Sequence, residues 1–217
     1  MIPLGDSRKR RRFPWTTTLL VLANAAAFAW ELGLGGRLTA TIARVAISPA
    51  EVVALTEPLR LAVRLLAALF LHGGWLHLLG NMAFLAVFGD DVEDKLGAKR
   101  FLILYLASGL MASSAQIAVT PRSTLPLIGA SGAIAGILGA FLVLFPKAKL
   151  AGVLPLGCLI IPLRSRAFLF IPLWFLLQLF GAFTAPPGSS AGNVAWYAHL
   201  AGFAAGPLLL VALRRRR

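Results

Sequence analysis

The chain has 217 residues, of which 59% are hydrophobic and 13% charged, and its mean hydropathy is +0.82. Soluble domains carry about 25% charged residues, so this composition excludes a soluble globular enzyme. The 21 glycines and 13 prolines, scattered through apolar runs, argue against disorder and against a coiled coil. A polytopic membrane protein remains. Its single cysteine, Cys158, cannot form an internal disulfide, so helix packing must hold the fold.

Six apolar stretches are predicted to span the membrane, since a bilayer requires about 20 residues per helix. They cover residues 16–35, 72–89, 101–120, 126–146, 167–184 and 194–213. We therefore expect an all-α, polytopic bundle of six transmembrane helices over residues 15–217. A basic cytoplasmic tail at residues 1–14 precedes it.

The net charge of +13 comes from basic residues that gather on one side of this topology. With both termini cytoplasmic, 16 of the 21 Lys and Arg residues lie inside and five outside, as the positive-inside rule requires. Attraction to the lipid bilayer explains these clusters, so no nucleic-acid partner is inferred. A basic start and an apolar run that ends at residues 24–27 also fit a cleaved signal peptide, and charge alone leaves this alternative open.

Two further segments are too short or too interrupted to span the membrane. Residues 36–71 form a long outer connection whose apolar part fits an amphipathic element in the membrane interface. In that position, Arg60 and Arg64 would extend toward the lipid headgroups. Residues 150–163 are broken by Pro155 and Pro162, and the pattern assigns them no role.

Few strongly polar side chains fall inside the predicted spans, and such groups are by default candidates for function. Apart from Glu31, near the end of the first span, no Asp or Glu lies within one. This argues against a proton pump, an ion-coupled carrier and a two-aspartate intramembrane protease. The polar residues within the spans are His72, His77, Asn81, Ser131 and His199.

These residues fall at one predicted depth. Ser131 and His199 each lie five residues into a span that runs inward from the outer surface, which is about 8 Å at 1.5 Å per residue. His77 has the same offset in the second span, and Asn81 follows one turn deeper on the same helix face. Three helices therefore bring four polar side chains to one layer.

Close helix packing would bring Ser131 within hydrogen-bonding distance of His199. Glycines four apart remove side chains from a helix face and allow two backbones to approach. Such glycines follow each residue, as Gly132 and Gly136 and as Gly202 and Gly206. A serine hydroxyl becomes a nucleophile when a neutral histidine takes its proton, so the pair is a candidate dyad for acyl transfer.

Acyl transfer also requires hydrogen-bond donors for the developing oxyanion. His77, Asn81 and the backbone N–H of Ser131, near a helix start, are candidates. Taken singly, a membrane serine or histidine is more often a packing residue, and the combination at one depth favours catalysis. Metal is not expected, because neither a His-Glu-x-x-His motif nor a membrane carboxylate accompanies the histidines.

The motifs between residues 60 and 206 resemble the rhomboid family of intramembrane serine proteases. They are His72-x-x-x-x-His77-x-x-x-Asn81, Gly129-x-Ser131-Gly132 and His199-x-x-Gly202-x-x-x-Gly206, with Gly89, Glu93 and Gly97 as a further family pattern. The resemblance implies a Ser131 nucleophile, a His199 general base and no cofactor. It also implies an oxyanion hole at His77 and Asn81, supported by His72.

The resemblance also implies a substrate class, because family members cut single-pass transmembrane proteins near the outer end of the substrate helix. The fifth predicted span, with Trp174, Phe175 and Gln178, resembles the family's substrate gate. Two positions depart from the family. Val63 stands where many members have tryptophan, and Ala135 stands where some have an aromatic residue against the catalytic histidine. Another group must therefore orient His199.

Two alternatives belong to other functional classes. The first is a non-catalytic scaffold or chaperone that uses the same fold to bind transmembrane clients. The second is a small-solute transporter, for which inverted repeats would be expected and none is seen. Compactness and the lack of an organelle-type presequence favour the plasma (inner) membrane of a prokaryote.

Overall fold

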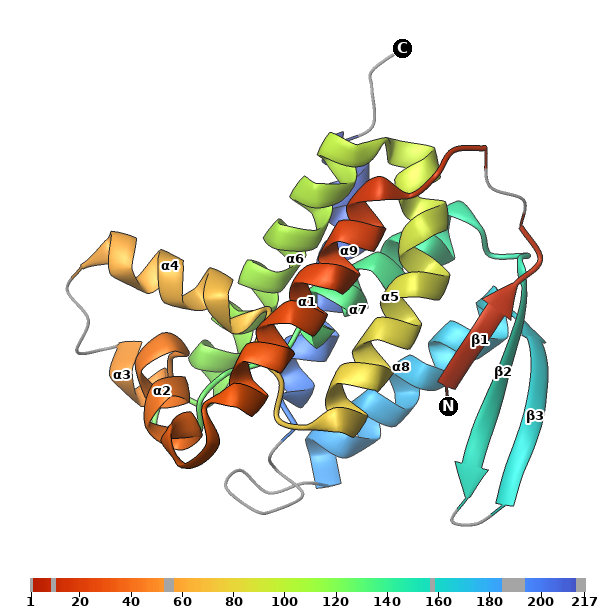
Figure 1. Ribbon diagram of the computed structural model, residues 1–217. Helices are drawn as coiled ribbons and strands as arrows, with labels where there is room; N and C mark the ends of the chain where they lie inside the picture. The colour runs from red at the N-terminus through yellow and green to blue at the C-terminus, as the bar shows by residue number, and fades with distance from the viewer. Residues whose placement is uncertain (1, 9–10, 53–56, 157–158, 185–193, 214–217) are drawn as a thin grey trace.

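The computed structural model describes residues 2–8, 11–52, 57–156, 159–184 and 194–213, and it is mainly helical (Figure 1). The long helices are α1 (Trp15–Gly33), α5 (Trp75–Leu96), α6 (Ala98–Val119), α7 (Ser131–Leu144), α8 (Ala167–Thr184) and α9 (Trp196–Leu213). Shorter helices follow α1: η1 (Gly35–Arg37), α2 (Leu38–Val45), α3 (Pro49–Val52) and α4 (Pro58–Ala68). This is the predicted helical architecture, with one small sheet that was not predicted.

Each of the six predicted stretches contains a helix, but the helices differ in their fitness to span a membrane. Within the described residues, α6, α8 and α9 are long and apolar enough, and α1 joins them if the 106° bend into η1 and α2 is counted within one span. Helix α7 has only 14 residues. Length and composition thus support three or four spans of the six predicted.

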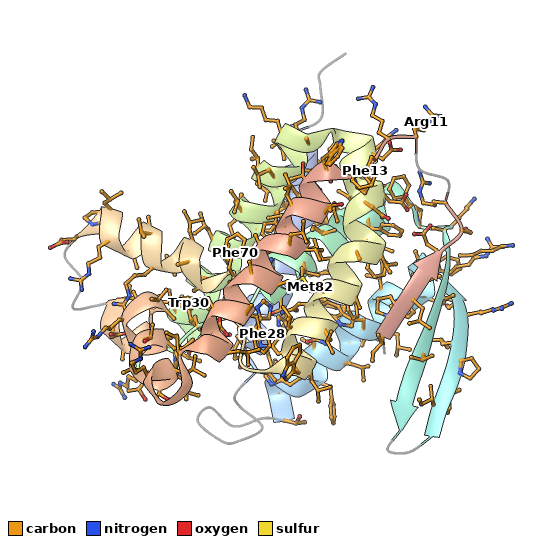
Figure 2. All side chains as sticks on the ribbon, viewed as in Figure 1. Arg11, Phe13, Phe28, Trp30, Phe70 and Met82 are labelled. Carbon is orange, nitrogen blue, oxygen red and sulfur yellow. The ribbon has the colours of Figure 1, made fainter. Side chains whose placement is uncertain are left out.

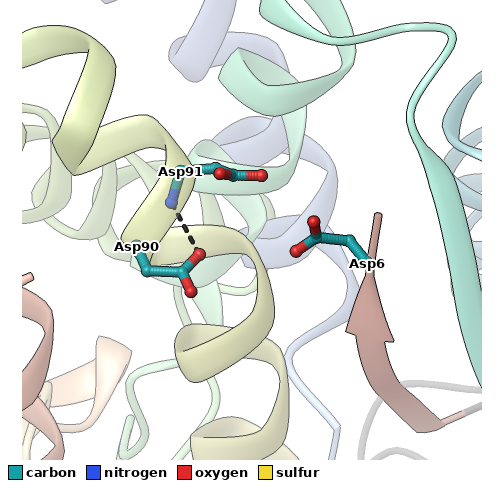
Figure 3. Close-up of side chains that lie close together, drawn as sticks. All are labelled: Asp6, Asp90 and Asp91. Carbon is teal, nitrogen blue, oxygen red and sulfur yellow. Dashed lines mark hydrogen bonds between the residues drawn. The ribbon is translucent and has the colours of Figure 1, made fainter. Parts of the chain in front are cut away.

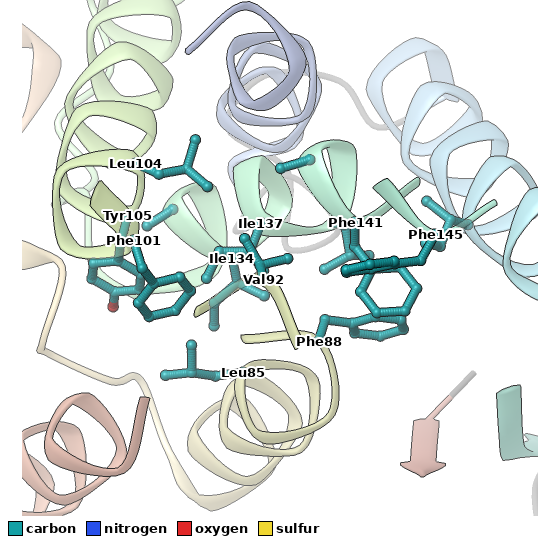
Figure 4. Close-up of a cluster of buried hydrophobic side chains, with 14 of the residues drawn as sticks. Leu85, Phe88, Val92, Phe101, Leu104, Tyr105, Ile134, Ile137, Phe141 and Phe145 are labelled. Carbon is teal, nitrogen blue, oxygen red and sulfur yellow. The ribbon is translucent and has the colours of Figure 1, made fainter. Parts of the chain in front are cut away.

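Helix α7 is the centre of the bundle and packs against α5, α6, α8 and α9. Its sequence is small and apolar on every face, and each residue from Gly132 to Phe141 is buried, as expected for a helix without a polar side. Large side chains of α5 and α6 close around it (Figure 4). They include Leu85, Phe88, Val92, Phe101, Leu104 and Tyr105, which meet Ile134, Ile137 and Phe141 of α7.

A carboxylate from α5 caps the start of α1. Glu93 accepts hydrogen bonds from the backbone N–H groups of Thr16 (2.8 Å) and Thr17 (2.7 Å) and from the Thr17 hydroxyl (2.8 Å). The first N–H groups of a helix lack partners within it and favour a negative charge. Gly89, one turn before Glu93, leaves room for Thr17, which explains the family spacing of these residues.

The ends of α1 carry aromatic side chains. Figure 2 shows Phe13 and Arg11 at one end of the helix and Phe28 and Trp30 at the other. Phe28 is buried and meets Trp75 at the start of α5 edge-on, with ring centroids 4.9 Å apart. Aromatic residues at both ends of an apolar helix are typical of membrane interfaces.

The outer connection is folded onto the bundle. Arg64 of α4 is buried, which corrects the expectation that its side chain extends toward lipid headgroups. Its guanidinium donates to the carbonyls of Ala43 (2.8 Å) and Ala46 and lies 3.4 Å from the Glu51 carboxylate. Arg60, one turn earlier, is exposed. The buried arginine therefore ties α4 to the end of α2 and to α3.

The segment without a predicted role forms two strands of a three-stranded antiparallel sheet in the order β1-β2-β3. The strands are β1 (Ile2–Asp6), β2 (Lys149–Leu156) and β3 (Leu159–Arg166). Pro155 and Pro162 each remove a helical hydrogen bond within a short segment, which favours extended structure here. In Figure 1 the sheet and helices α2 to α4 lie on opposite sides of the bundle. Strand β1 brings residues expected in the basic tail into contact with α5.

Three carboxylates meet where β1 approaches α5 (Figure 3). Asp6, Asp90 and Asp91 each offer an oxygen within 4.8 Å of the others. The Arg8 guanidinium lies 3.0 Å from Asp91 and 3.5 Å from the Phe145 ring centroid. The arginine thereby joins the end of β1 to both α5 and the residue after α7.

Candidate active site

Ser131 is the first residue of α7, whereas it was expected five residues into a longer helix. The preceding chain is extended: Leu127 forms a β-bridge with Ile47, and the Gly129 N–H donates to the Ala68 carbonyl at 2.9 Å. Gly129 has a φ of +117°, a conformation that side-chain-bearing residues rarely adopt. The backbone N–H of Ser131 thus belongs to the first helical turn, where amides lack helical partners.

The serine and the predicted general base are in contact. His199 lies in the first turn of α9, and its Nε2 is 2.8 Å from Ser131 Oγ. Its other ring nitrogen, Nδ1, is 2.7 Å from Oε1 of Gln178 on α8. An amide oxygen only accepts hydrogen bonds, so Nδ1 carries the proton and Nε2 presents its lone pair to the serine hydroxyl.

Glycines allow α7 and α9 to approach at the level of these two residues. A Cβ added at Gly202 would overlap the carbonyl oxygen of Gly132, and one at Gly206 would overlap that of Gly136. Backbone contact of this kind leaves no room for an intervening side chain. It holds the serine and the imidazole within the reach of one hydrogen bond.

Aromatic rings from α8 and α9 enclose His199. The centroids of Trp174 and Trp196 each lie 6.2 Å from that of the imidazole, and the Trp196 ring is nearly perpendicular to it. Ala135, on α7, offers no ring. The two tryptophans and Gln178 therefore contact His199 in place of the aromatic side chain that some family members have at the position of Ala135.

His77 lies close to the serine on a third helix. A Cβ added at Gly129 would be 2.7 Å from both Cε1 and Nε2 of His77 and 3.7 Å from Ser131 Oγ. The Gly73 N–H donates to His77 Nδ1 at 3.3 Å, so the neutral ring carries its proton on Nε2. A hydrogen-bond donor thereby lies beside Gly129, two residues before the serine.

Asn81 and His72 form a second pair in contact with this group. Asn81 Nδ2 donates to His72 Nε2 at 3.0 Å, and His72 Nδ1 donates to the Phe70 carbonyl at 3.1 Å. The His72 ring also meets His77 edge-on at 5.1 Å. One amide hydrogen of Asn81 remains beyond the bond to His72.

A buried acid positions the loop that carries His72. Both carboxylate oxygens of Glu31, at the end of α1, accept from the His72 backbone N–H, at 3.0 and 3.3 Å. Only 2% of Glu31 is exposed. The sequence offered one signal for this residue, an acid at the end of an otherwise apolar span, but did not indicate its partner.

The two residues of the predicted gate both lie near Phe203 of α9, whose ring centroid is 6.4 Å from that of Trp174. Trp174 lies 6.1 Å from Phe84 of α5 between ring centroids, so it reaches from α8 toward the neighbouring helix. Phe175 stacks on Phe203 of α9 at 4.7 Å. Of these two gate residues, Trp174 is therefore the one that lies near both a ring of α5 and the His199 ring.

A small cavity opens beside the serine. It encloses about 30 Å³, which is room for one or two waters. Its lining includes Gly109, Ala112, Gly129, Ser131, Gly132 and Ala198. The Asp6, Asp90 and Asp91 group lies where β1 meets α5 and shares no residue with this cavity.

Comparisons with known proteins agree on one family. A model of the rhomboid domain matches residues 60–216. The chain is 46% identical over 79 residues to rhomboid protease GluP of Bacillus subtilis, which covers 36% of this chain and 15% of GluP. It is 30% identical over 155 residues to RHOMBOID-like protein 1 of Arabidopsis thaliana, or 60% of this chain and 39% of that protein. A third relative, the mitochondrial rhomboid protein 1 of Saccharomyces cerevisiae, is 36% identical over 92 residues, 41% and 27% of the two chains.

The chain spans less than half the length of each of these relatives. The domain match, by contrast, covers most of the chain and includes every residue from Arg60 to Gly206 that carried the resemblance. Its apolar helices are those of an integral membrane protein. The chain belongs to the rhomboid family.

Proposed function

We propose that the protein is an intramembrane serine endopeptidase that cleaves single-pass transmembrane proteins near the outer membrane face. The observation that carries this proposal is the 2.8 Å contact between Ser131 Oγ and the lone-pair nitrogen of His199. Membership of a family that includes a named rhomboid protease supports it.

In this reaction Ser131 Oγ attacks the carbonyl carbon of the substrate peptide, and its proton passes to His199 Nε2. The tetrahedral intermediate carries its negative charge on the former carbonyl oxygen. His199 then gives the proton to the departing amine, which breaks the C–N bond and leaves an acyl group on the serine. Water attacks the ester by the reverse proton path and releases the second product.

The oxyanion would accept hydrogen bonds from the Ser131 backbone N–H, from His77 Nε2 and from Asn81. Each such donor is worth about 3–4 kcal/mol of transition-state stabilisation in serine proteases. The tautomer of His77 fixed by Gly73 supports this role, because it leaves a donor on Nε2 beside Gly129, two residues before the serine. The cavity beside Ser131 supplies space for the hydrolytic water.

The proposed setting is a six-helix bundle with both termini in the cytoplasm, in the plasma membrane of a prokaryote. The distribution of Lys and Arg supports this orientation. Helix α7 is about 21 Å long at 1.5 Å per residue, shorter than a hydrocarbon core of about 30 Å. If its inner end lies at the cytoplasmic boundary, Ser131 lies about 9 Å below the outer boundary, near the end of a substrate helix.

The test is cleavage of a model single-pass substrate in proteoliposomes by the wild-type protein and by the Ser131→Ala and His199→Ala variants. We expect cleavage by the wild type alone and covalent labelling of Ser131 by a fluorophosphonate. Undiminished cleavage by either variant would contradict the proposal. Substrate binding without turnover by the wild type would favour a non-catalytic scaffold for transmembrane clients.

A further inference from the structure

We propose that Gln178 is the residue that orients the catalytic base, as the third member of a Ser131–His199–Gln178 relay. This inference rests on the proposed protease function and adds a positioning residue to it. The helix assigned to a substrate gate would then also take part in preparing the chemistry.

A catalytic histidine needs a group that orients its ring. A histidine can take the serine proton only if its lone pair faces the hydroxyl, so the opposite ring nitrogen must keep its hydrogen. In Ser-His-Asp sites a carboxylate accepts that hydrogen and holds the tautomer. Within the described residues, no Asp or Glu oxygen makes a hydrogen bond or ion pair with His199. Among the described residues, the acceptor for the Nδ1 hydrogen is Gln178 Oε1, at 2.7 Å.

The packing of α8 and α9 holds both partners of the bond between Gln178 and His199. Trp174, one turn before Gln178 on the same face of α8, lies against the imidazole, and Trp196 meets the imidazole edge-on. The Tyr197 hydroxyl donates to the Ala182 carbonyl at 3.3 Å, and Trp196 fills the space over Gly181. Contacts one turn before and one turn after Gln178 therefore fix α8 beside α9.

A neutral hydrogen-bond acceptor suits this site. A carboxylate at this depth would need a partner to offset its desolvation. A glutamine amide supplies the same acceptor geometry without a charge. The hydrogen-bonded chain of Ser131, His199 and Gln178 can therefore lie within the membrane without a buried charge when no substrate is bound.

Three substitutions separate orientation from packing. Gln178→Leu removes the acceptor with little change of volume, Gln178→Asn withdraws it by one methylene, and Gln178→Glu keeps it and adds a charge. Leu177→Ala, at an exposed neighbour on α8, is the control for disturbance of the helix. His77, the other ionisable side chain close to Ser131, is unchanged in every variant.

The measurements are kcat and KM for a model single-pass substrate in proteoliposomes, their pH profiles, and the rate of Ser131 labelling by a soluble fluorophosphonate. The label needs no entry of a substrate helix, so it reports the serine and its base apart from any gate. We expect Gln178→Leu and Gln178→Asn to lower kcat and the labelling rate about tenfold or more, the effect of one lost hydrogen bond and a freed tautomer. KM should change less than threefold.

Gln178→Glu should retain most of the activity and move the acidic limb of the kcat profile to higher pH, because a carboxylate stabilises the imidazolium. Leu177→Ala should behave as wild type. If Gln178→Leu does not fold, the contrast between the Asn and Glu variants gives the same answer.

The inference is overturned if Gln178→Leu, or Gln178→Asn in its place, labels at the wild-type rate. It is also overturned if that variant changes KM alone, or if Gln178→Glu loses as much activity as Gln178→Asn. The proposed function fails by a different result, namely cleavage that persists in Ser131→Ala.

Discussion

The α-carbon of Gly202 lies directly against the carbonyl oxygen of Gly132, so that α9 touches the backbone of α7 one residue beyond the serine. A methyl group at this position has no side chain to push aside, because the atom that it would meet belongs to the backbone. The distance between Ser131 and His199 therefore depends on a residue that takes no part in the chemistry.

We expect Gly202→Ala to lower kcat at least about a hundredfold, since a displacement of about 1 Å is enough for such a loss. It should also lower the Tm, because the close contact of α7 and α9 is part of the core. Gly80→Ala is the matched control: a Cβ there meets nothing within 4 Å, and it lies in α5. Equal activity of the two variants would show that the contact does not set the geometry of the site.

His77→Ala should lower kcat by about 10²–10³, the loss typical of one oxyanion donor. Because the negative charge develops only in the transition state, KM should change little. Leu79→Ala, at an exposed position on the same helix, controls for changes in α5. A rise in KM with kcat intact would instead assign His77 to substrate binding.

Arg64→Gln should lower the Tm by several degrees, while Arg60→Gln should leave it within about one degree. The buried Arg64 donates to the Ala43 and Ala46 carbonyls, and a buried acceptor without a donor costs about 1–3 kcal/mol. Arg60 is exposed on the same helix. Similar melting curves for the two variants would mean that Arg64 does not hold the outer connection.

The outer connection should also respond to acid. Hydrogen bonds from the Ser48 backbone N–H and hydroxyl, with the nearby Arg64 charge, lower the pKa of Glu51 below its ordinary value. A carboxyl group with a lowered pKa in the folded state stabilises the fold above its ordinary pKa and loses this effect as the pH falls through the lowered one. Glu51→Gln should therefore reduce the Tm at pH 7.

The difference in Tm between wild type and Glu51→Gln should shrink as the pH falls below about 4. At pH 7 the two proteins should differ by less than about 1 kcal/mol in free energy of unfolding, because the Glu51 side chain is 47% exposed. Thermal unfolding of both proteins in detergent, at pH 7 and below about pH 4, measures the difference in Tm. A gap that widens in acid would contradict the assigned sign.

The sequence predicted a helical membrane protein because apolar runs of this length have few other uses, and the polar residues within them were conspicuous. Spacing along single helices also identified Ser131, His199, His77 and the glycines as candidate site residues. The start of α7 was placed five residues too early, since Leu127 and Ile128 are as apolar as the helix that follows. The bridge to Ile47, the hydrogen bond from the Gly129 N–H to Ala68 and the positive φ of Gly129 keep that stretch out of the helix.

What the sequence could not predict are pairings between distant segments. Gln178 was noted beside the gate residues, but its bond to His199 joins positions 21 residues apart across two helices and a loop. The sheet pairs residues 2–6 with residues 150–153, and no periodicity in either segment indicates the other. Glu31 and His72 are separated by 41 residues. Such contacts follow from the packed fold.

If the proposed function holds, the position of Gln178 on α8 also limits how the enzyme can admit its substrate. An outward swing of that helix by little more than 1 Å would stretch the 2.7 Å bond beyond hydrogen-bonding range and leave the imidazole free to turn. The enzyme would thus be inactive while α8 is displaced outward. It would become active again only when α8 returns and closes around a bound polypeptide. The hydrogen bond between Gln178 and His199, which prepares the serine for reaction, would therefore also protect neighbouring membrane proteins from cleavage.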